Sequence, residues 1–356
     1  MHLSKLGEEA LLDHLFERFH LPRTGPGLVV GVGDDAAVLD LDSGKLTVVT
    51  TDMMVEGPHF RLDLITPYHL GWKAIAVNIS DIAAMGGLPT WTFASVGLKP
   101  DTDLEFVDSL YEGMTACAEK FLSKIIGGDT NAVDANTVLS ITQLGQVEKD
   151  HLALRSGAQI GDKILVTGWL GNSIAGLHLL LKYGLDEAAE RFGWLVDVHL
   201  MPMPRVWEAR AAVETGGVHA MMDLSDGLGR DLPKLCTARA SAVRTSIPIP
   251  RDIPIRRDKA SGVGALVYAD KLPISADLRK AAEVLGTNPI DLAAGGGEDF
   301  ELLMAVSPDA VGKIMRAVKE TGTSVTDIGE IVEGPVEIVG LDGARKPLKG
   351  GWEHFK

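Results

Sequence analysis

Cysteine and aromatic residues are scarce in this chain of 356 residues. It has two cysteines, Cys117 and Cys236, and aromatic side chains make up 5% of the sequence. Neither cysteine has another cysteine or a histidine at metal-ligand spacing, which argues against a zinc site and against a disulfide framework. Unpaired thiols fit a reducing compartment, so we expect a cytoplasmic protein.

Positive charge is also in short supply. The chain has 34 lysines and arginines against 49 aspartates and glutamates, which gives a formal net charge of −15. An acidic surface repels nucleic-acid phosphates and anionic lipids. Nucleic acid is therefore not expected as a partner, and a phosphate-bearing ligand should arrive with a metal ion.

Long apolar runs are absent as well. No stretch reaches the roughly 18 apolar residues that a membrane-spanning helix needs. Apolar residues between Leu11 and Phe19 alternate with acidic ones, which predicts an amphipathic helix rather than a secretory signal. No membrane partner is expected.

The remaining composition is that of an ordinary folded protein, with 46% hydrophobic and 23% charged residues. The length exceeds the ~150 residues of a typical single domain about twofold, which predicts two domains. The polar, turn-rich stretch 148–161 has no strong periodicity, so we place the boundary there and predict domains at 1–150 and 151–356. Strand-like and helical patterns alternate throughout, so the expected class is α/β of the α+β type: an N-terminal mixed sheet with helices, then a C-terminal α/β domain.

One helix is specified in detail. Thr66 and Pro67 supply an N-cap and a first-turn proline, and an isoleucine-rich stripe runs from Trp72 until Gly86 ends the helix. Strands are predicted at 28–32, 46–51, 92–98, 124–126, 138–147, 163–167, 218–223, 242–247, 300–306 and 325–331, and further helices at 103–120, 173–182, 204–214, 227–239, 276–285 and 309–320.

A dinucleotide-binding fingerprint is imitated near the N-terminus. Gly31 and Gly33 follow an apolar strand, and Asp52 lies at about the expected spacing. The fingerprint requires a helix after the glycines, whereas the residues from Ala36 onward predict a β-hairpin. We therefore reject a nicotinamide-binding fold, and no Walker-type loop is present.

Aspartates recur beside glycine or hydroxyl residues where apolar strands are expected to end. They are Asp34, Asp35, Asp52, Asp129, Asp223 and Asp226. Carboxylates and threonine hydroxyls are oxygen donors that suit Mg²⁺. Asp81 interrupts the apolar helix and should be paired or metal-bound if buried. Each aspartate alone could equally be a turn or cap residue.

Ordered motifs along the chain resemble the thiamine-monophosphate kinase family. They run from about Gly31 to Phe355 and read GVGDDAAVL, TTDMMVEGPHF, GWKAIAVNISDIAAMGG, IIGGDT, LALRSGAQIGD, VTGWLGNSIAGL, HLMPMPR, MMDLSDGL, GGGEDFELL and GGWEHF. That family is similar to aminoimidazole ribonucleotide synthetase and other ATP-using proteins. The resemblance implies a two-domain fold in which the N-terminal domain binds ATP and metal and forms a homodimer, and the C-terminal domain completes the site.

The resemblance also implies roles for individual residues. Metal ligands, expected to hold several Mg²⁺ ions, would be Asp35, Thr50, Thr51, Asp52, Asp81, Asp129, Asp223 and Asp226. ATP contacts would come from Tyr111, Gly128, Asp129, Arg155 and Ser225, and thiamine monophosphate contacts from His59, Glu298 and Trp352. From the residues alone, His59 could be a surface histidine and Trp352 a plug over the core edge.

The implied activity is phosphorylation of thiamine monophosphate by ATP to give thiamine diphosphate. The acceptor phosphate is already an anion, so no residue is assigned as acid, base or nucleophile, and direct in-line transfer is expected. The alternatives are a sister ATP-using enzyme of the same group and a non-catalytic sensor of thiamine phosphate or nucleotide. Loss of the metal-binding aspartates would favour the sensor, and none is missing.

Overall fold

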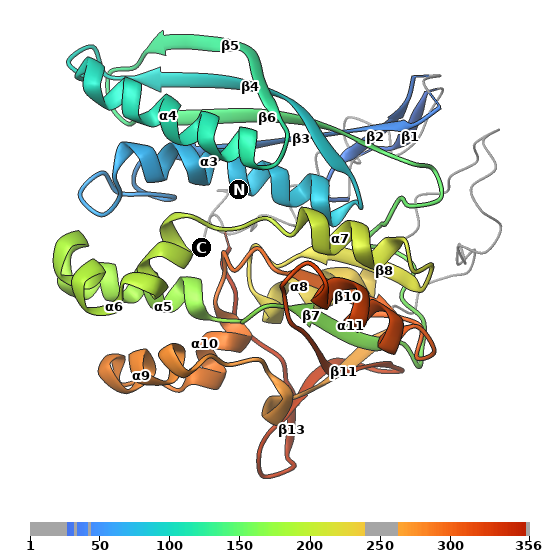
Figure 1. Cartoon of the computed structure of the whole chain (residues 1–356). Helices are drawn as coiled ribbons and strands as arrows, with labels where there is room; N and C mark the ends of the chain where they lie inside the picture. Colours follow the sequence, from blue (N-terminus) through green and yellow to red (C-terminus); the bar gives the residue numbers. More distant parts are fainter. Residues whose placement is uncertain (1–26, 32–33, 42–43, 239–262, 354–356) are drawn as a thin grey trace, which may run out of the picture.

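A computed structural model describes residues 27–31, 34–41, 44–238 and 263–353. Figure 1 shows one sheet at the top, two helices beneath it, and the remaining sheet and helices below these. The helix expected in the first 26 residues and the strand expected at 242–247 lie outside the described residues.

The first sheet has the order β1-β2-β3-β6-β4-β5. Its strands are β1 (Leu28–Val30), β2 (Ala37–Asp40), β3 (Leu46–Val55), β4 (Leu88–Leu98), β5 (Lys124–Ala132) and β6 (Val138–Val147). β4 and β5 are parallel and the other neighbours antiparallel, so the predicted mixed sheet is confirmed. The predicted hairpin is β2–β3, which leaves no room for a dinucleotide-binding helix after the glycines.

Two helices, α3 (Pro67–Ala84) and α4 (Leu104–Lys120), lie together beneath this sheet (Figure 1). The Thr66 hydroxyl accepts a hydrogen bond from the backbone N–H of His69, as expected of an N-cap. The two helices pack so closely that a Cβ on Gly71 would lie 1.9 Å from the carbonyl oxygen of Leu110. The predicted stripe on α3 is buried; its members are Trp72, Ile75, Ile79 and Ile82.

The opposite face of this sheet carries large exposed side chains. Trp91 and Phe93 on β4 are 45% and 40% exposed, and Ile126 on the edge strand β5 is 52% exposed. Apolar side chains that gather on one face are typical of a surface that contacts another molecule.

The second sheet has the order β13-β12-β9-β11-β7-β10-β8 and is antiparallel except for the β12–β9 pair. Its strands are β7 (Lys163–Thr167), β8 (Val218–Asp223), β9 (Gly264–Tyr268), β10 (Leu302–Val306), β11 (Val325–Val332), β12 (Val336–Val339) and β13 (Arg345–Pro347). Its helices are α5 (Asn172–Tyr183), α6 (Leu185–Leu200), α7 (Val206–Val213), α8 (Leu228–Thr237), α9 (Ala276–Leu285), α10 (Pro289–Gly295) and α11 (Val311–Lys319), with a 3₁₀ turn η1 (Ala269–Lys271).

α6, β9, α10, β12 and β13 were not predicted from the sequence. β9 follows a proline-studded segment that favours a loop, yet it pairs with β11 and β12 inside the sheet. α6 contains non-helical backbone at Phe192, which breaks the hydrophobic period.

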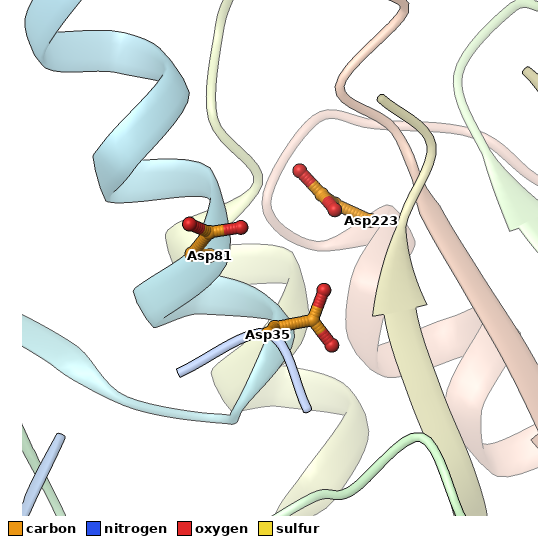
Figure 2. Close-up of side chains that lie close together, drawn as sticks. All are labelled: Asp35, Asp81 and Asp223. Carbon is orange, nitrogen blue, oxygen red and sulfur yellow. The ribbon is translucent and has the colours of Figure 1, made fainter. Parts of the chain in front are cut away.

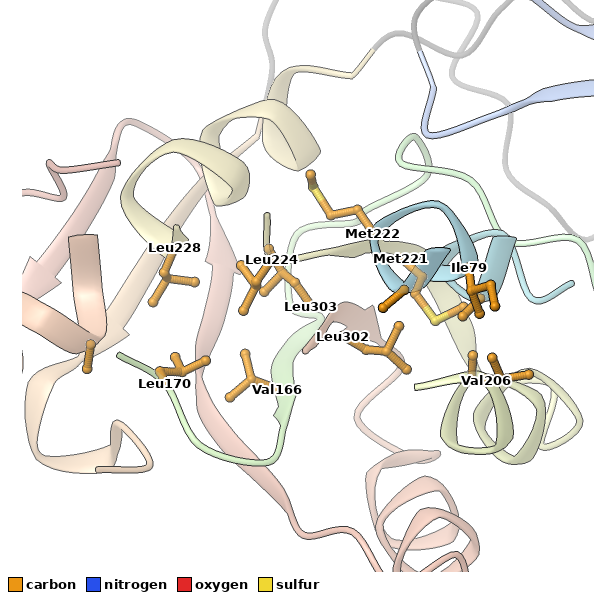
Figure 3. Packing of buried hydrophobic residues seen from close by; sticks show 14 of the residues in the cluster. Ile79, Val166, Leu170, Val206, Met221, Met222, Leu224, Leu228, Leu302 and Leu303 are labelled. Atoms are coloured by element: carbon orange, nitrogen blue, oxygen red, sulfur yellow. The ribbon is translucent and has the colours of Figure 1, made fainter. Parts of the chain in front are cut away.

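The core is continuous between the two halves of the chain. β6 ends at Val147 and β7 begins at Lys163, but α3 packs against β8 and α7 of the second half. In Figure 3 Ile79 of α3 lies in the same buried cluster as Met221 of β8 and Val206 of α7. α3 is therefore shared by both halves, and the division at 150/151 stays a prediction.

The two cysteines, Cys117 and Cys236, are buried and free. Across the described part of the chain, no helix combines the length and the apolar character needed to cross a membrane.

Candidate functional site

A cavity of about 1110 Å³, here called the central pocket, collects most of the predicted site residues. It is lined by β3, α3 and α5 and by loops of the second half of the chain. Predicted residues on its wall are Asp35, Thr50, Thr51, Asp52, His59, Asp81, Arg155, Asp223, Ser225, Asp226, Glu298 and Trp352. Residues from distant parts of the chain thus meet in one place.

Three aspartates converge at one end of the central pocket. Asp35 comes from the β1–β2 connection, Asp81 from α3 and Asp223 from the last position of β8 (Figure 2). Each offers a carboxylate oxygen, and these oxygens all lie within 4.8 Å of one another. Together with Asp52 they are called the acid cluster below.

β3 adds further oxygen donors to the acid cluster. The Thr50 hydroxyl donates to Asp81 Oδ2 at 2.6 Å, and the Asp52 backbone N–H donates to Asn78 Oδ1 at 3.0 Å. The Thr51 hydroxyl instead donates to the carbonyl of Ile141 at 2.9 Å, across the sheet. Asp52 lies inside β3 and not at its end, so the expectation that these aspartates all follow strand ends is wrong. The mostly antiparallel sheet does not gather strand ends at one edge.

The acid cluster is crowded with negative charge. Burial, with the nearby Asp35 charge, raises the pKa of Asp223 to about 8 and that of Asp52 to about 6. Burial and the charge of Asp52 also raise the pKa of Asp81 well above its ordinary value. Among the described residues, no lysine, arginine or histidine lies within salt-bridge distance of these three carboxylates.

Asp223 carries an unsatisfied oxygen. Its Oδ2 accepts a hydrogen bond from the Ser80 hydroxyl at 2.6 Å, whereas its buried Oδ1 has no hydrogen-bond partner in the described structure. Buried carboxylate oxygens without partners are costly unless a cation binds them. The donor set of carboxylates and a threonine hydroxyl fits Mg²⁺, so Asp35, Thr50, Asp52, Asp81 and Asp223 could hold it.

Arg155 sits at the edge of the acid cluster. Its Nε and Nη2 donate to both oxygens of Asp35, at 2.7 and 2.6 Å. This fork-like geometry is the one that arginine uses to bind carboxylates and phosphates. The same guanidinium could therefore serve a phosphate group that enters the central pocket.

The loop after β8 brings Ser225 and Asp226 to the pocket wall. Asp226 Oδ2 is 2.6 Å from Lys234 Nζ, so this carboxylate already has a counter-ion. The carbonyl of Ser225 accepts a hydrogen bond from the Glu298 backbone N–H at 2.7 Å, which ties this loop to the Gly295–Asp299 segment. A Cβ on Gly297 would lie 2.9 Å from the same carbonyl, so these glycines serve close loop packing.

His59, Glu298 and Trp352 also line the central pocket, and the region around Glu298 is here called the glutamate end. His59 Nδ1 accepts a hydrogen bond from the Val55 backbone N–H at 3.0 Å, which fixes the ring near the end of β3. Trp352 is 51% exposed, and its backbone N–H donates to the carbonyl of Asp226 at 3.0 Å. A plug over the core edge would be more deeply buried than this.

Lys73 supplies the counter-ion of Glu298. Its Nζ lies 3.0 Å from both carboxylate oxygens. The effects of burial and of this ammonium oppose each other, and the pKa of Glu298 is lowered overall. Glu298 is therefore ionised at neutral pH.

Three predicted residues do not line the central pocket. Gly128 and Asp129 lie on the exposed edge strand β5, and Tyr111 is half-buried on α4. Asp129 is hydrogen-bonded locally, to the Thr130 N–H and the Asn131 side chain. Gly128 has a φ of +154°, and a Cβ there would lie 1.8 Å from the Ala94 carbonyl oxygen, so the glycine is needed for strand packing.

Lys73 and His199 line the central pocket but were not predicted from the sequence. A usable signal was present for Lys73. It interrupts an apolar helix just as Asp81 does, and the two stand eight residues apart, on one face of α3. His199 gave no comparable signal, because its partners come from distant segments.

Comparison with known proteins identifies both halves of the chain. Residues 33–147 match the family model described as AIR synthase related protein, N-terminal domain, and residues 159–259 match its C-terminal domain.

Close relatives extend over almost the whole chain. A thiamine-monophosphate kinase of Aquifex aeolicus (strain VF5) is 33% identical over 356 residues and covers 100% of both chains. That of Bacillus subtilis (strain 168) is 33% identical over 92% of this chain and 94% of its own.

Solved structures agree with these relatives. AaThiL complexed with AMPPCP and TMP superposes with a TM-score of 0.80 at 31% identity, covering 99% of each chain. The hydrogenase maturation protein HypE of E. coli superposes with a TM-score of 0.63 at 20% identity, which shows a shared fold alone.

Proposed function

The chain belongs to the thiamine-monophosphate kinase family, and we propose that its central pocket transfers the γ-phosphoryl group of ATP directly to the phosphate of thiamine monophosphate. The products are thiamine diphosphate and ADP. The activity follows from the family; direct transfer, the metal and the residue roles are the proposal.

The observation that carries the proposal is the acid cluster. Asp223 is buried and Asp52 and Asp81 are partly buried, none of the three has a lysine or arginine within salt-bridge distance in the described structure, and one oxygen of Asp223 lacks a hydrogen-bond partner. A polyphosphate could not approach such a cluster unless cations bound there first. When bound, Mg²⁺ would neutralise phosphate charge and orient the phosphate oxygens.

The protein's own groups position the reactants. The acceptor phosphate is ionised near neutral pH, so no base has to remove a proton from it. Arg155 can exchange the two oxygens of Asp35 for two oxygens of a phosphate without losing fork-like hydrogen bonding. Catalysis then consists of holding two anions in line, which agrees with a pocket lined by paired and metal-binding carboxylates.

The glutamate end suits the organic part of the acceptor. Thiamine has a flat cationic thiazolium and a flat aminopyrimidine, for which an aromatic face and a carboxylate are complementary. Trp352 and Glu298 provide these groups, and Ile174, Leu177 and Leu180 of α5 add an apolar wall. His59, next to β3, is placed to meet the acceptor phosphate.

A homodimer would explain the residues that do not line the pocket. Asp129, Gly128 and the exposed Ile126 share the edge strand β5, next to the exposed Phe93 of β4. Two copies that join through this surface would cover the apolar side chains and could bring Asp129 to the partner's pocket.

Mixing two impaired variants tests this arrangement. If Asp129 acts across the dimer, mixed dimers of Asp52→Asn and Asp129→Asn chains contain one intact site and regain activity. If Asp129 acts within its own chain, both sites stay defective and mixing restores nothing. Sedimentation as a 37.9 kDa monomer would contradict the dimer itself.

The cytoplasm remains the expected compartment. Cys117 and Cys236 are both free and buried, a state that a reducing environment preserves.

An ADP-release assay tests the function. Thiamine monophosphate, thiamine, an aminoimidazole ribonucleotide precursor and selenide are offered separately with Mg²⁺ and ATP. We expect turnover with thiamine monophosphate, with thiamine diphosphate and ADP formed in equal amounts. Release of AMP and orthophosphate, or turnover with another acceptor only, would assign the chain to a sister activity, and binding without turnover would indicate a sensor.

A further inference from the structure

Lys73 is a charged residue buried in an apolar helix. It is 1% exposed and ranks among the largest fully buried side chains of the protein. An ammonium group is retained in such a place only when it is paired and hydrogen-bonded. None of the roles considered so far requires a lysine here.

The partners of Lys73 define its surroundings. Its Nζ donates to both oxygens of Glu298 at 3.0 Å and lies 3.5 Å from Nε2 of His199. An ammonium has no acceptor, so Nε2 of His199 must accept and the ring proton must sit on Nδ1. Nδ1 lies 3.1 Å from the Ser173 hydroxyl on α5 and 3.5 Å from Glu298 Oε2, so His199 contacts both members of the ion pair.

The neutral state of His199 fits this tautomer. Burial and the adjacent ammonium of Lys73 lower the pKa of His199 to about 3, so the ring remains neutral at physiological pH. Lys73 is then the only cation in this network, and its charge is directed at Glu298.

Glu298 depends on contacts for its orientation. Its φ is +63°, in the left-handed region that residues other than glycine rarely adopt. Its backbone N–H donates to the Ser225 carbonyl, and both of its carboxylate oxygens lie next to the Lys73 ammonium. About a third of the side chain, 35%, remains exposed toward the central pocket.

We propose that Lys73 is a positioning residue for acceptor recognition, which holds the Glu298 carboxylate ionised and fixed in direction at the glutamate end. His199, which is held by Ser173, contacts both the ammonium and the carboxylate and so keeps the pair in place. With part of its charge compensated, Glu298 accepts hydrogen bonds from N–H groups on the ring system of the acceptor. This inference rests on the proposed function, because Glu298 must face the acceptor.

A purely structural role is the alternative. Lys73 belongs to α3 and Glu298 to the second half of the chain, so their ion pair could simply join the two halves. In that case its loss would lower stability without a selective effect on one substrate.

A double-mutant cycle separates the two roles. Lys73→Met, Glu298→Gln and the double variant are compared by KM for thiamine monophosphate, KM for ATP and kcat. We expect each single variant to raise the KM for thiamine monophosphate about tenfold or more and to leave the KM for ATP within about twofold. The double variant should be no worse than Glu298→Gln alone, because Lys73 acts through Glu298.

Arg205→Met is the matched control. Arg205 forms a comparable two-pronged ion pair with Glu301, at 2.7 and 2.6 Å, and neither residue lines the central pocket. Its loss should lower the unfolding temperature and leave both KM values unchanged. If Lys73→Met behaves in the same way, the inference is overturned.

Two further outcomes are informative. If Lys73→Met does not fold, the double variant carries the test, and a KM for thiamine monophosphate far above that of Glu298→Gln overturns the inference. Failure of the wild-type protein to phosphorylate thiamine monophosphate would instead refute the proposed function, which the wild-type assay detects by itself.

Discussion

At one end of the central pocket Asp81 and Asp223 have no lysine or arginine of the described structure within salt-bridge distance, whereas at the other end Glu298 is held by Lys73. Burial raises the pKa of both aspartates, whereas the pKa of Glu298 is lowered although burial opposes this, and Lys73 is the first of the groups that lower it. The same chemical group is thus kept in opposite states within one cavity.

The comparison teaches that a counter-ion decides what a buried carboxylate can do. In the proposed function, carboxylates without one bind the cations that arrive with the nucleotide. A carboxylate with its own lysine has no need of a metal ion and is free to accept hydrogen bonds from a ligand. α3 contributes to both ends, through Asp81 and through Lys73.

The largest effect should come from removing charge at the acid cluster. Asp52→Asn keeps the shape of the side chain but removes a metal-binding oxygen anion. We expect kcat to fall at least ~10²-fold, equivalent to about 3 kcal/mol, while the protein still folds. Steady-state kinetics and thermal unfolding measure both quantities. Asp277→Asn, on the exposed start of α9, serves as the control, and a collapse in stability with unchanged activity would show that Asp52 is structural.

A substitution at the glutamate end should change acceptor binding and not the phosphoryl-transfer step. Trp352→Ala removes the aromatic face offered to the acceptor and should weaken thiamine monophosphate binding by about 1 to 3 kcal/mol with little change for ATP. Calorimetry with each ligand measures this. Trp207→Ala is a matched control, because Trp207 is 42% exposed on α7 and does not line the pocket. Equal losses for both ligands would contradict substrate stacking.

The pH dependence of stability should show that Asp223 lacks a counter-ion within salt-bridge distance. The pKa of Asp223 is raised by burial and by Asp35, from 3.8 to about 8, so the folded metal-free protein retains a proton that the unfolded chain releases. Its contribution to stability is present below about pH 4 and is lost as pH rises toward 8. In EDTA, Asp223→Asn should therefore show a shallower fall of unfolding temperature between pH 5 and 8 than the wild type. Equal slopes, measured by calorimetry, would refute this assignment.

The smallest expected effect is a loss of stability that does not distinguish the two ends of the central pocket. Thr66→Ala removes the N-cap of α3 and should cost about 1 kcal/mol of stability. Because α3 carries residues of both ends, neither substrate should be affected selectively. Urea unfolding measures the cost, and a KM change confined to one substrate would show that the cap tunes one end directly.

The parts of this structure that the sequence predicts are those governed by local signals. Thr66, Pro67 and the stripe from Trp72 define α3, and the ordered motifs indicate the family together with the residues that converge on the acid cluster. The edge position of Asp129 could not be foreseen, because nothing local shows which strand ends a sheet.

The sequence also does not predict which residues of distant segments pair with one another. Lys73 forms an ion pair with Glu298, 225 residues away in the sequence, and the counter-ion of Asp35 is Arg155, 120 residues away. The aspartate pattern predicts a metal site, but which carboxylates lack a counter-ion is a property of the packed structure alone.

The helix that joins the two ends also sets a length. Lys73 and Asp81 stand on one face of α3, and eight residues at the helical rise of about 1.5 Å separate them by about 12 Å along the axis. In the proposed arrangement, α3 thereby sets the distance between the carboxylate that would hold the ring and the carboxylates that would gather the phosphates. If both roles hold, an acceptor whose ring and phosphate are joined by too short a linker could not reach both groups, and the length of the linker would contribute to substrate selection.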